Sequence, residues 1–143
     1  MQSTFDSLYK SDEDAATNGI PIIIGKNPKG GEVTLWIAEN LNPKHKKAMR
    51  KRSKKMESNR TSDEREKLVC EIYAEGILIT WEGVVDSNGD VIEPTFENKV
   101  AMLKKYDRLF NDIAAISENH NNYLSEGEDP DAEEETEGNL EAS

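Results

Sequence analysis

The chain has 143 residues, of which 35% are hydrophobic, so its length and composition allow one modest domain with a small core. Its single cysteine, Cys70, excludes an internal disulfide framework, and no apolar run is long enough to span a membrane. With no charged and then apolar leader at the N-terminus, these features predict a reducing cytoplasmic compartment. The formal net charge of −11 is unevenly distributed.

Charge divides the chain into three parts. Residues 1–18 carry four acids against Lys10, residues 126–143 carry nine acids and no base, and residues 19–125 are nearly neutral. The last part has too few apolar groups to offset the entropy of ordering it, which predicts a disordered acidic tail. Such a tail is expected to solubilise the protein; the alternatives are that it masks the basic helix of the same chain or mimics nucleic acid. We therefore expect a flexible N-terminal arm over 1–18, a single domain over 19–125 and a disordered tail over 126–143.

The N-terminal half holds three apolar segments. Phe5, Leu8 and Tyr9 have the spacing of one helix face, so a short docking helix is the alternative to a loose arm. Residues 20–24 and 32–37 are β-branched or aromatic runs and predict two strands of a hairpin. The glycine-rich loop between them lacks the order of a phosphate-binding loop, and no helix start follows it.

A strongly basic helix is predicted after Asn42 and Pro43, which fit an N-cap and the first helical residue. Residues 44–60 carry nine bases against Glu57. Such a field attracts either an acidic protein surface or phosphates. Nucleic acid is the less favoured partner, because the segment lacks interleaved aromatic residues for stacking.

A second helix is predicted from Ser62. Its core face carries Leu68, Val69, Ile72 and Tyr73. We expect this helix to continue to about Thr80, although residues 77–81 fit a strand equally well. Cys70 lies off the apolar stripe, and we interpret it as an ordinary small side chain rather than a nucleophile.

A tight turn is predicted at Asn88-Gly89, which lies between residues of extended character. This dipeptide favours a two-residue type I′ turn, in which both central residues have positive φ. The acidic residues around it also resemble a calcium-binding loop. That loop would need glycine at the position of Val91, so a hairpin is the better interpretation.

Two further helices are predicted after Pro94. Thr95 can cap the first and Asp107 the second, which would end near Leu124; alternatively the two form one helix through Tyr106. The predicted fold class is therefore α+β, with small β-hairpin elements packed against about four α-helices and followed by the disordered acidic tail.

No catalytic or metal site is predicted. The two histidines, His45 and His120, lie in a basic helix and near a polar helix end, without the pattern of partners that a known mechanism requires. We expect them to be solvated surface side chains. We expect no enzymatic activity and no cofactor.

The segment from Trp81 has the pattern W-x-G-V-x-D-x-x-G, and Pro94-Thr95 and Asn98 then open the next helix. In these features the chain resembles the tail assembly chaperones of long-tailed, siphovirus-like bacteriophages, over roughly residues 20–124. The resemblance implies a non-enzymatic protein of the host cytoplasm that uses no cofactor. It also implies that the protein coats the tape-measure protein and helps to recruit tail-tube subunits during virion assembly.

A chaperone of this kind needs charge and exposed apolar surface to hold its client. We expect an acidic client or a neighbouring copy to contact five bases: Lys46, Lys47, Arg50, Lys51 and Lys54. We expect core, and in part a client groove, from four apolar residues: Trp81, Phe96, Leu103 and Phe110. Two other functions stay open: a structural head-tail junction or minor tail protein retained in the virion, or a nucleic-acid-binding accessory protein that uses helix 44–55. A homo-oligomer is compatible with all three, and no membrane partner is expected.

Overall fold

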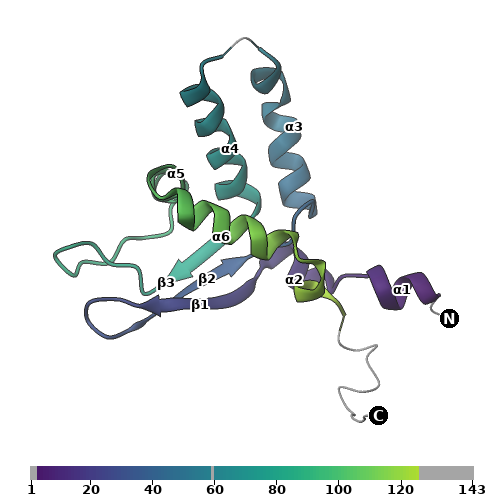
Figure 1. The fold of residues 1–143 in the computed structure, drawn as a ribbon, viewed down its shortest axis with the longest axis horizontal. Coiled ribbons are helices and arrows are strands. Elements are labelled where there is room, and N and C mark those ends of the chain that lie inside the picture. The colour runs from purple at the N-terminus through teal and green to yellow at the C-terminus, as the bar shows by residue number, and fades with distance from the viewer. Residues whose placement is uncertain (1–2, 59, 126–143) are drawn as a thin grey trace.

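The computed structural model describes residues 3–58 and 60–125 and has an α+β fold, as predicted (Figure 1). The described helices are α1 (Thr4–Tyr9), α2 (Glu13–Asn18), α3 (Pro43–Glu57), α4 (Ser62–Gly76), α5 (Phe96–Lys105), α6 (Asp107–Glu118) and the 3-10 helix η1 (His120–Tyr123). The strands are β1 (Ile20–Lys26), β2 (Glu32–Ile37) and β3 (Leu78–Glu82). The predicted acidic tail, 126–143, lies outside the described residues.

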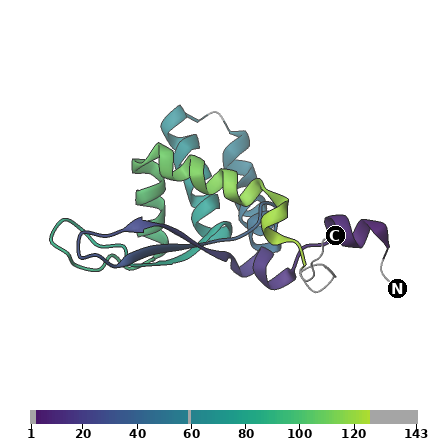
Figure 2. The same cartoon turned by 60° about the horizontal axis from the view of Figure 1, so that its bottom comes forward.

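The three strands form one antiparallel sheet in the order β1-β2-β3. The predicted hairpin of β1 and β2 is confirmed, with Ile20 paired to Ile37 and Ile22 to Leu35. The register shifts between Ile23 and Gly25, so β1 bulges near its end. Helices α3 to α6 lie on one face of this sheet, and α3 and α4 project away from it as a pair (Figures 1 and 2).

The segment after α4 is a strand, so the expectation of helix through Thr80 is wrong. Helix α4 ends at Gly76, and β3 begins at Leu78 and pairs with β2. Pairing with β2 satisfies the hydrogen-bonding groups of the β3 backbone, and it buries Leu78 and Trp81 in the core. One more turn of α4 would not do both. Gly76 is also required for packing, because a Cβ there would lie 2.5 Å from the Cα of His45 on α3.

The turn near residue 88 is also different from the predicted type I′ turn. Gly89 has a φ of +84°, but Asn88 does not have a positive φ. The amide of Gly89 donates to the carbonyl of Asp86, so Ser87 and Asn88 are the central residues. The Asp86 carboxylate accepts hydrogen bonds from the amides of Asn88 and Asp90 at 2.8 and 3.0 Å. This side-chain acceptor stabilises a longer turn that places only the glycine in the left-handed region.

The N-terminal segment contains two short helices where the sequence favoured a loose arm. Helix α1 has a capping box formed by Ser3 and Asp6. After it, Ser11 forms a β-bridge with Leu124, and the amide of Asp12 donates to the carbonyl of Tyr123 at 2.7 Å. The chain from Ser11 onward is therefore attached to the domain, whereas α1 extends from it (Figure 1).

Helices α5 and α6 are separate elements. Thr95 caps α5 as predicted, since its side chain accepts from the amide of Asn98 at 3.1 Å. Tyr106, with φ −120° and ψ 94°, breaks the helical path between them. Asp107 is the first residue of α6 and not its cap, because no side chain caps this helix. Helix α6 ends at Glu118, and η1 continues to Tyr123 instead of the predicted longer helix.

Candidate protein-interaction surfaces

The five predicted basic residues of α3 share one exposed surface, which we name the basic face: Lys46, Lys47, Arg50, Lys51 and Lys54. Lys46, Arg50 and Lys54 follow one another at intervals of four residues, and so do Lys47 and Lys51 in the neighbouring row. Residues with this spacing lie on the same side of a helix. The opposite side of α3 is buried against α4 through His45, Ala48 and Arg52. The five bases therefore lie on one exposed surface, and their contact with an acidic client or a neighbouring copy stays a prediction.

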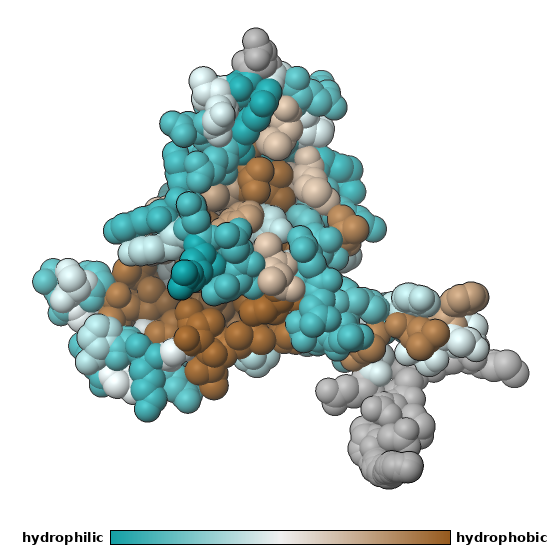
Figure 3. Space-filling model, in the orientation of Figure 1, coloured by the Kyte–Doolittle hydropathy of each residue, from teal (hydrophilic) through white to brown (hydrophobic). Residues whose placement is uncertain are grey.

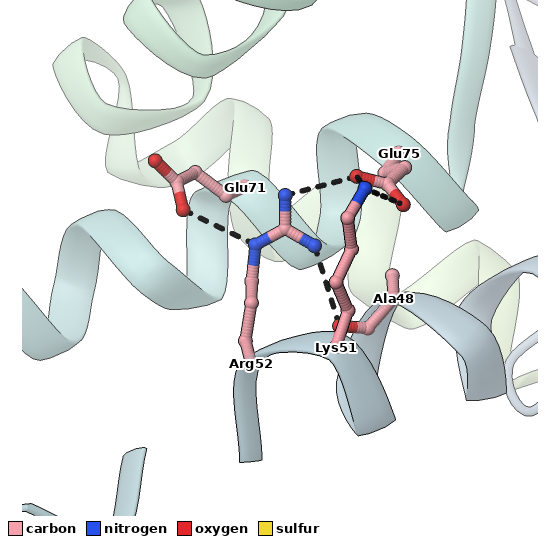
Figure 4. Close-up of polar contacts among 5 residues, drawn as sticks. All are labelled: Ala48, Lys51, Arg52, Glu71 and Glu75. Atoms are coloured by element: carbon pink, nitrogen blue, oxygen red, sulfur yellow. Dashed lines mark hydrogen bonds and ion pairs between the residues drawn. The ribbon is translucent and has the colours of Figure 1, made fainter. Parts of the chain in front are cut away.

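Arg52 differs from the other bases of α3 because it is buried. Its Nε and Nη2 contact the carboxylates of Glu71 and Glu75 on α4 at 3.1 and 2.9 Å, and its Nη1 donates to the carbonyl of Ala48 (Figure 4). Burial alone would raise the pKa of the Glu75 carboxyl, but Arg52 and Lys51 outweigh it and hold that pKa below its ordinary value. Arg52 thus joins α3 to α4 and is not available to a partner.

Most of the basic face keeps its charge available. Lys51 pairs with Glu75 at 3.3 Å, with 60% of its side chain exposed. Within the described part of the chain, Lys46, Lys47, Arg50 and Lys54 form no ion pair. Uncompensated like charges on one surface attract an acidic partner and accelerate its association.

The four predicted apolar partner residues do not form one groove. Trp81 and Leu103 are buried in the core. Phe110 is half-buried and packs against Tyr73, with ring centroids 4.5 Å apart. Phe96 is 36% exposed and lies beside the Arg52 guanidinium, which is 5.9 Å from its ring centroid. Trp81, Leu103 and Phe110 therefore belong to the core or pack against it, whereas Phe96 lies at the surface. Of the four, only Trp81 borders the groove described next.

An apolar groove lies between the sheet and the start of α6. Two adjoining pockets of about 240 and 400 Å³ form it, and both are lined by Ile24, Leu35, Tyr106 and Leu109. Figure 3 shows hydrophobic residues gathered below α6 over the strands. Ile24 and Tyr106 remain 50% and 47% exposed. The sequence signal that could have predicted this groove is the run of three isoleucines at 22–24. Successive side chains of a strand point to opposite faces, so this run places apolar side chains on both faces of the edge strand, where one buried face would need them on only one.

The comparisons with known proteins identify the family. The sequence model described as YdaY prophage protein matches residues 38–139, which is more than half of the chain. The chain belongs to this prophage protein family. No curated protein and no solved structure matches it. A phage-related origin is therefore established, and it agrees with the broader part of the resemblance to phage proteins.

The residues matched by the family model include the whole basic face but only part of the apolar groove. The whole basic face lies within the matched residues 38–139. The groove is only partly within them, because Tyr106 and Leu109 are matched, whereas Ile24 and Leu35 precede the match. The groove therefore needs the first hairpin, which the family match does not include.

The W-x-G-V segment builds one wall of the groove. Trp81, Gly83, Val84 and Val85 all line it. Gly83 has a φ of +83°, and a Cβ there would lie 2.0 Å from the carbonyl oxygen of Glu32 on β2. The glycine of this segment thus permits a close approach that aims the following valines at the groove.

Neither histidine is the solvated surface side chain that we expected. His45 is buried and accepts a hydrogen bond from the Leu41 amide at its Nδ1, and burial lowers its pKa. His120 is half-buried, and its Nδ1 lies 2.5 Å from a carboxylate oxygen of Glu39. Glu39 is far from His120 in the sequence, and His45 is buried because α3 packs against α4, where the Tyr73 ring centroid lies 5.9 Å from that of His45. Neither environment follows from the local sequence. No helix among the described residues is long and apolar enough to cross a membrane.

Proposed function

We propose that this prophage protein is a non-enzymatic tail assembly chaperone. It binds the tape-measure protein and helps to recruit tail-tube subunits during virion assembly in the host cytoplasm. The proposal is supported by the membership of a prophage protein family and by the resemblance of the segment from Trp81 to phage tail assembly chaperones. The structural observation that carries it is the exposed basic face of α3, in which only Lys51 forms an ion pair with another described residue.

The basic face suits an acidic helical client. Its residues lie within nine positions of α3, from Lys46 to Lys54, which are about 12 Å apart along the helix axis. Each exposed ion pair contributes about 1 kcal/mol or less, so a row of them gives weak and reversible binding. Reversibility is needed in a chaperone, because it must leave the client when tail subunits arrive.

The same uncompensated charges favour a second candidate, nucleic-acid binding. The basic face would neutralise phosphates and release counterions. It offers no aromatic side chain on which bases could stack, which makes this candidate the weaker one. Retention in the virion as a head-tail junction or minor tail protein is the remaining alternative.

The test is an affinity pull-down from cells in which the phage is produced, with and without nuclease, followed by mass spectrometry. We expect the tape-measure protein to be recovered in both samples. The variant Lys46→Glu/Arg50→Glu/Lys54→Glu should recover much less of it, because these three bases form one row and none is in an ion pair within the described chain.

A matched control reverses three exposed charges elsewhere, at Arg65, Lys67 and Lys104. It changes the net charge equally and should leave recovery unchanged. Three outcomes would reject the chaperone function: no tape-measure protein in the wild-type sample, nucleic acid alone that disappears with nuclease, or the protein itself in purified particles at fixed copy number.

A further inference from the structure

The basic face of α3 carries positive charge that the described chain leaves mostly unbalanced. Of its five residues, only Lys51 forms an ion pair with another described residue. The first turn of α3 holds no acidic residue that would offset these charges. Bases that repeat at intervals of four residues repel one another along a helix and destabilise it. A negatively charged segment that lies on the basic face would therefore stabilise α3.

The chain carries a segment of the opposite charge at its C-terminal end. The acidic tail, residues 126–143, contains nine acids and no base, and seven of the nine lie within residues 126–135. Its negative charges outnumber the five bases of the basic face. Charge complementarity of this kind draws two surfaces together and fixes their pairing.

The acidic tail begins next to the helix that leads to α3. The amide of Ser125 donates to the carbonyl of Lys10 at 3.3 Å, and α2 starts three residues after Lys10. At the end of α2, the side-chain oxygen of Asn18 accepts a hydrogen bond from the Nζ of Lys44 at 3.1 Å. Figures 1 and 2 both show α2 next to the base of α3. Residue 126 therefore follows a point that lies one short helix away from α3.

The basic face is within reach of the acidic tail. Helix α2 is about 9 Å long, and the basic face extends about 12 Å along the axis of α3. With the connecting side chains, the path from Ser125 to the far end of the basic face is about 35 Å. Ten extended residues span up to about 35 Å, and eighteen span about 60 Å. The acid-rich residues 126–135 alone are therefore long enough to reach all five bases.

We propose that the acidic tail docks on the basic face of its own chain and occupies it until an acidic client displaces it. Attachment to the same chain keeps the tail at an effective concentration of about millimolar near the face, which favours it over the tail of another copy. Exposed ion pairs are individually weak and are screened by salt, so the contact is reversible. Displacement by a client rests on the proposed function, whereas the docking itself does not.

Carbodiimide cross-linking of the full-length wild-type protein tests the contact. This reagent joins a lysine amine directly to a carboxylate, so it links groups that form an ion pair. The sample is a dilute mixture of unlabelled and nitrogen-15-labelled protein, and mass spectrometry separates links within one chain from links between copies. We expect links within one chain from the acidic tail to the lysines of the basic face. They should become fewer as the salt concentration rises.

Lys26 and Lys29 are the internal controls, because both are exposed at the first hairpin, away from α3. They should form links with the tail only at background level. Two outcomes would overturn the proposal: links from the tail to the basic face no more frequent than links to these controls, or links to the basic face only between copies.

Binding of a fluorescent peptide of ten glutamates, followed by anisotropy, provides the second readout. The full-length variant Glu133→Gln/Glu134→Gln/Glu135→Gln should bind this peptide about fivefold or more tightly than wild type, because a weakened tail leaves more of the basic face free. A matched control removes three exposed acids elsewhere, in Glu32→Gln/Glu82→Gln/Glu93→Gln. It changes the net charge equally and should bind like wild type.

Each contrary result of the peptide measurement would overturn the proposal. Equal affinity of the tail variant and wild type would show that the tail does not occupy the face, and an equal gain in both variants would show an effect of net charge alone. A peptide that binds none of the proteins would show that the face attracts no acidic segment. No client is present in either measurement, so failure of the tail contact is distinguishable from failure of the chaperone function, which the pull-down tests.

Discussion

The indole Nε1 of Trp81 donates a hydrogen bond of 2.7 Å to the carbonyl oxygen of Ile92. This bond connects the end of β3 to the chain that leads into α5, across the loop that contains Gly83 and the turn at Gly89. It therefore fixes the position of the loop that forms one wall of the apolar groove.

Replacement of Trp81 by phenylalanine should destabilise the protein by about 2 kcal/mol, because the partly buried hydrogen bond to Ile92 is lost and the smaller ring leaves a space in the core. Urea unfolding followed by circular dichroism measures this. Trp36→Phe is the matched control, since the Trp36 indole makes no hydrogen bond within the described chain and the residue is half-buried. We expect a cost of about 0.5 kcal/mol there. Equal costs for the two variants would show that the bond to Ile92 is unimportant.

Removal of the Arg52 charge by Arg52→Met should cost about 2 kcal/mol in the free energy of unfolding. Glu71 and Glu75 would be left partly buried without their partner, and their partial exposure keeps the cost below that of a fully buried pair. The comparison is Lys51→Met, which also loses a contact with Glu75 but from a mostly exposed side chain. We expect about 0.5 kcal/mol for this control. If the two variants unfold at the same urea concentration, the buried Arg52 contacts stabilise the fold no more than the exposed Lys51 contact does.

Acid should weaken the fold through His45. Burial lowers the pKa of His45 from its ordinary 6.5, so the unfolded chain takes up a proton at a higher pH than the folded one. The stabilisation is complete above about pH 6.5 and decreases as the pH falls through the interval between the two pKa values. Unfolding free energies of wild type and His45→Asn at about pH 7.5 and 5.5 test this, because asparagine accepts a hydrogen bond but does not titrate. The wild type should lose more stability than the variant; an equal loss would exclude His45 as the cause.

Gly83→Ala should destabilise the fold by several times more than Gly30→Ala. Both glycines have φ values near +85°, at +83° and +88°, so both substitutions incur the backbone strain of about 1–2 kcal/mol. Only at position 83 would the new Cβ collide with the backbone, 2.0 Å from the Glu32 carbonyl oxygen; at position 30 the space is open. Thermal unfolding of the two variants separates strain from collision. Similar losses in both would mean that the loop can move away from β2.

Local signals in the sequence determined where most helices begin and where the first hairpin lies. Asn42 and Thr95 cap α3 and α5 through bonds to amides two or three residues away, so their effect does not depend on the rest of the fold. The periodicity of the apolar residues likewise predicted the α+β class and the burial of Trp81 and Leu103. The density of charge in α3 predicted a largely exposed basic helix but could not single out Arg52, which is buried.

Tertiary structure decided the features that depend on partners far away in the chain. Residues 78–82 are a strand because β2 offers hydrogen bonds to them, and their local sequence fitted helix and strand equally well. Arg52 is buried, unlike its basic neighbours, because Glu71 and Glu75 lie opposite it on α4. The apolar groove exists only because the fold brings β1 close to α6. Contacts of this kind require the whole chain to be folded, whereas caps and periodicity act within a few residues.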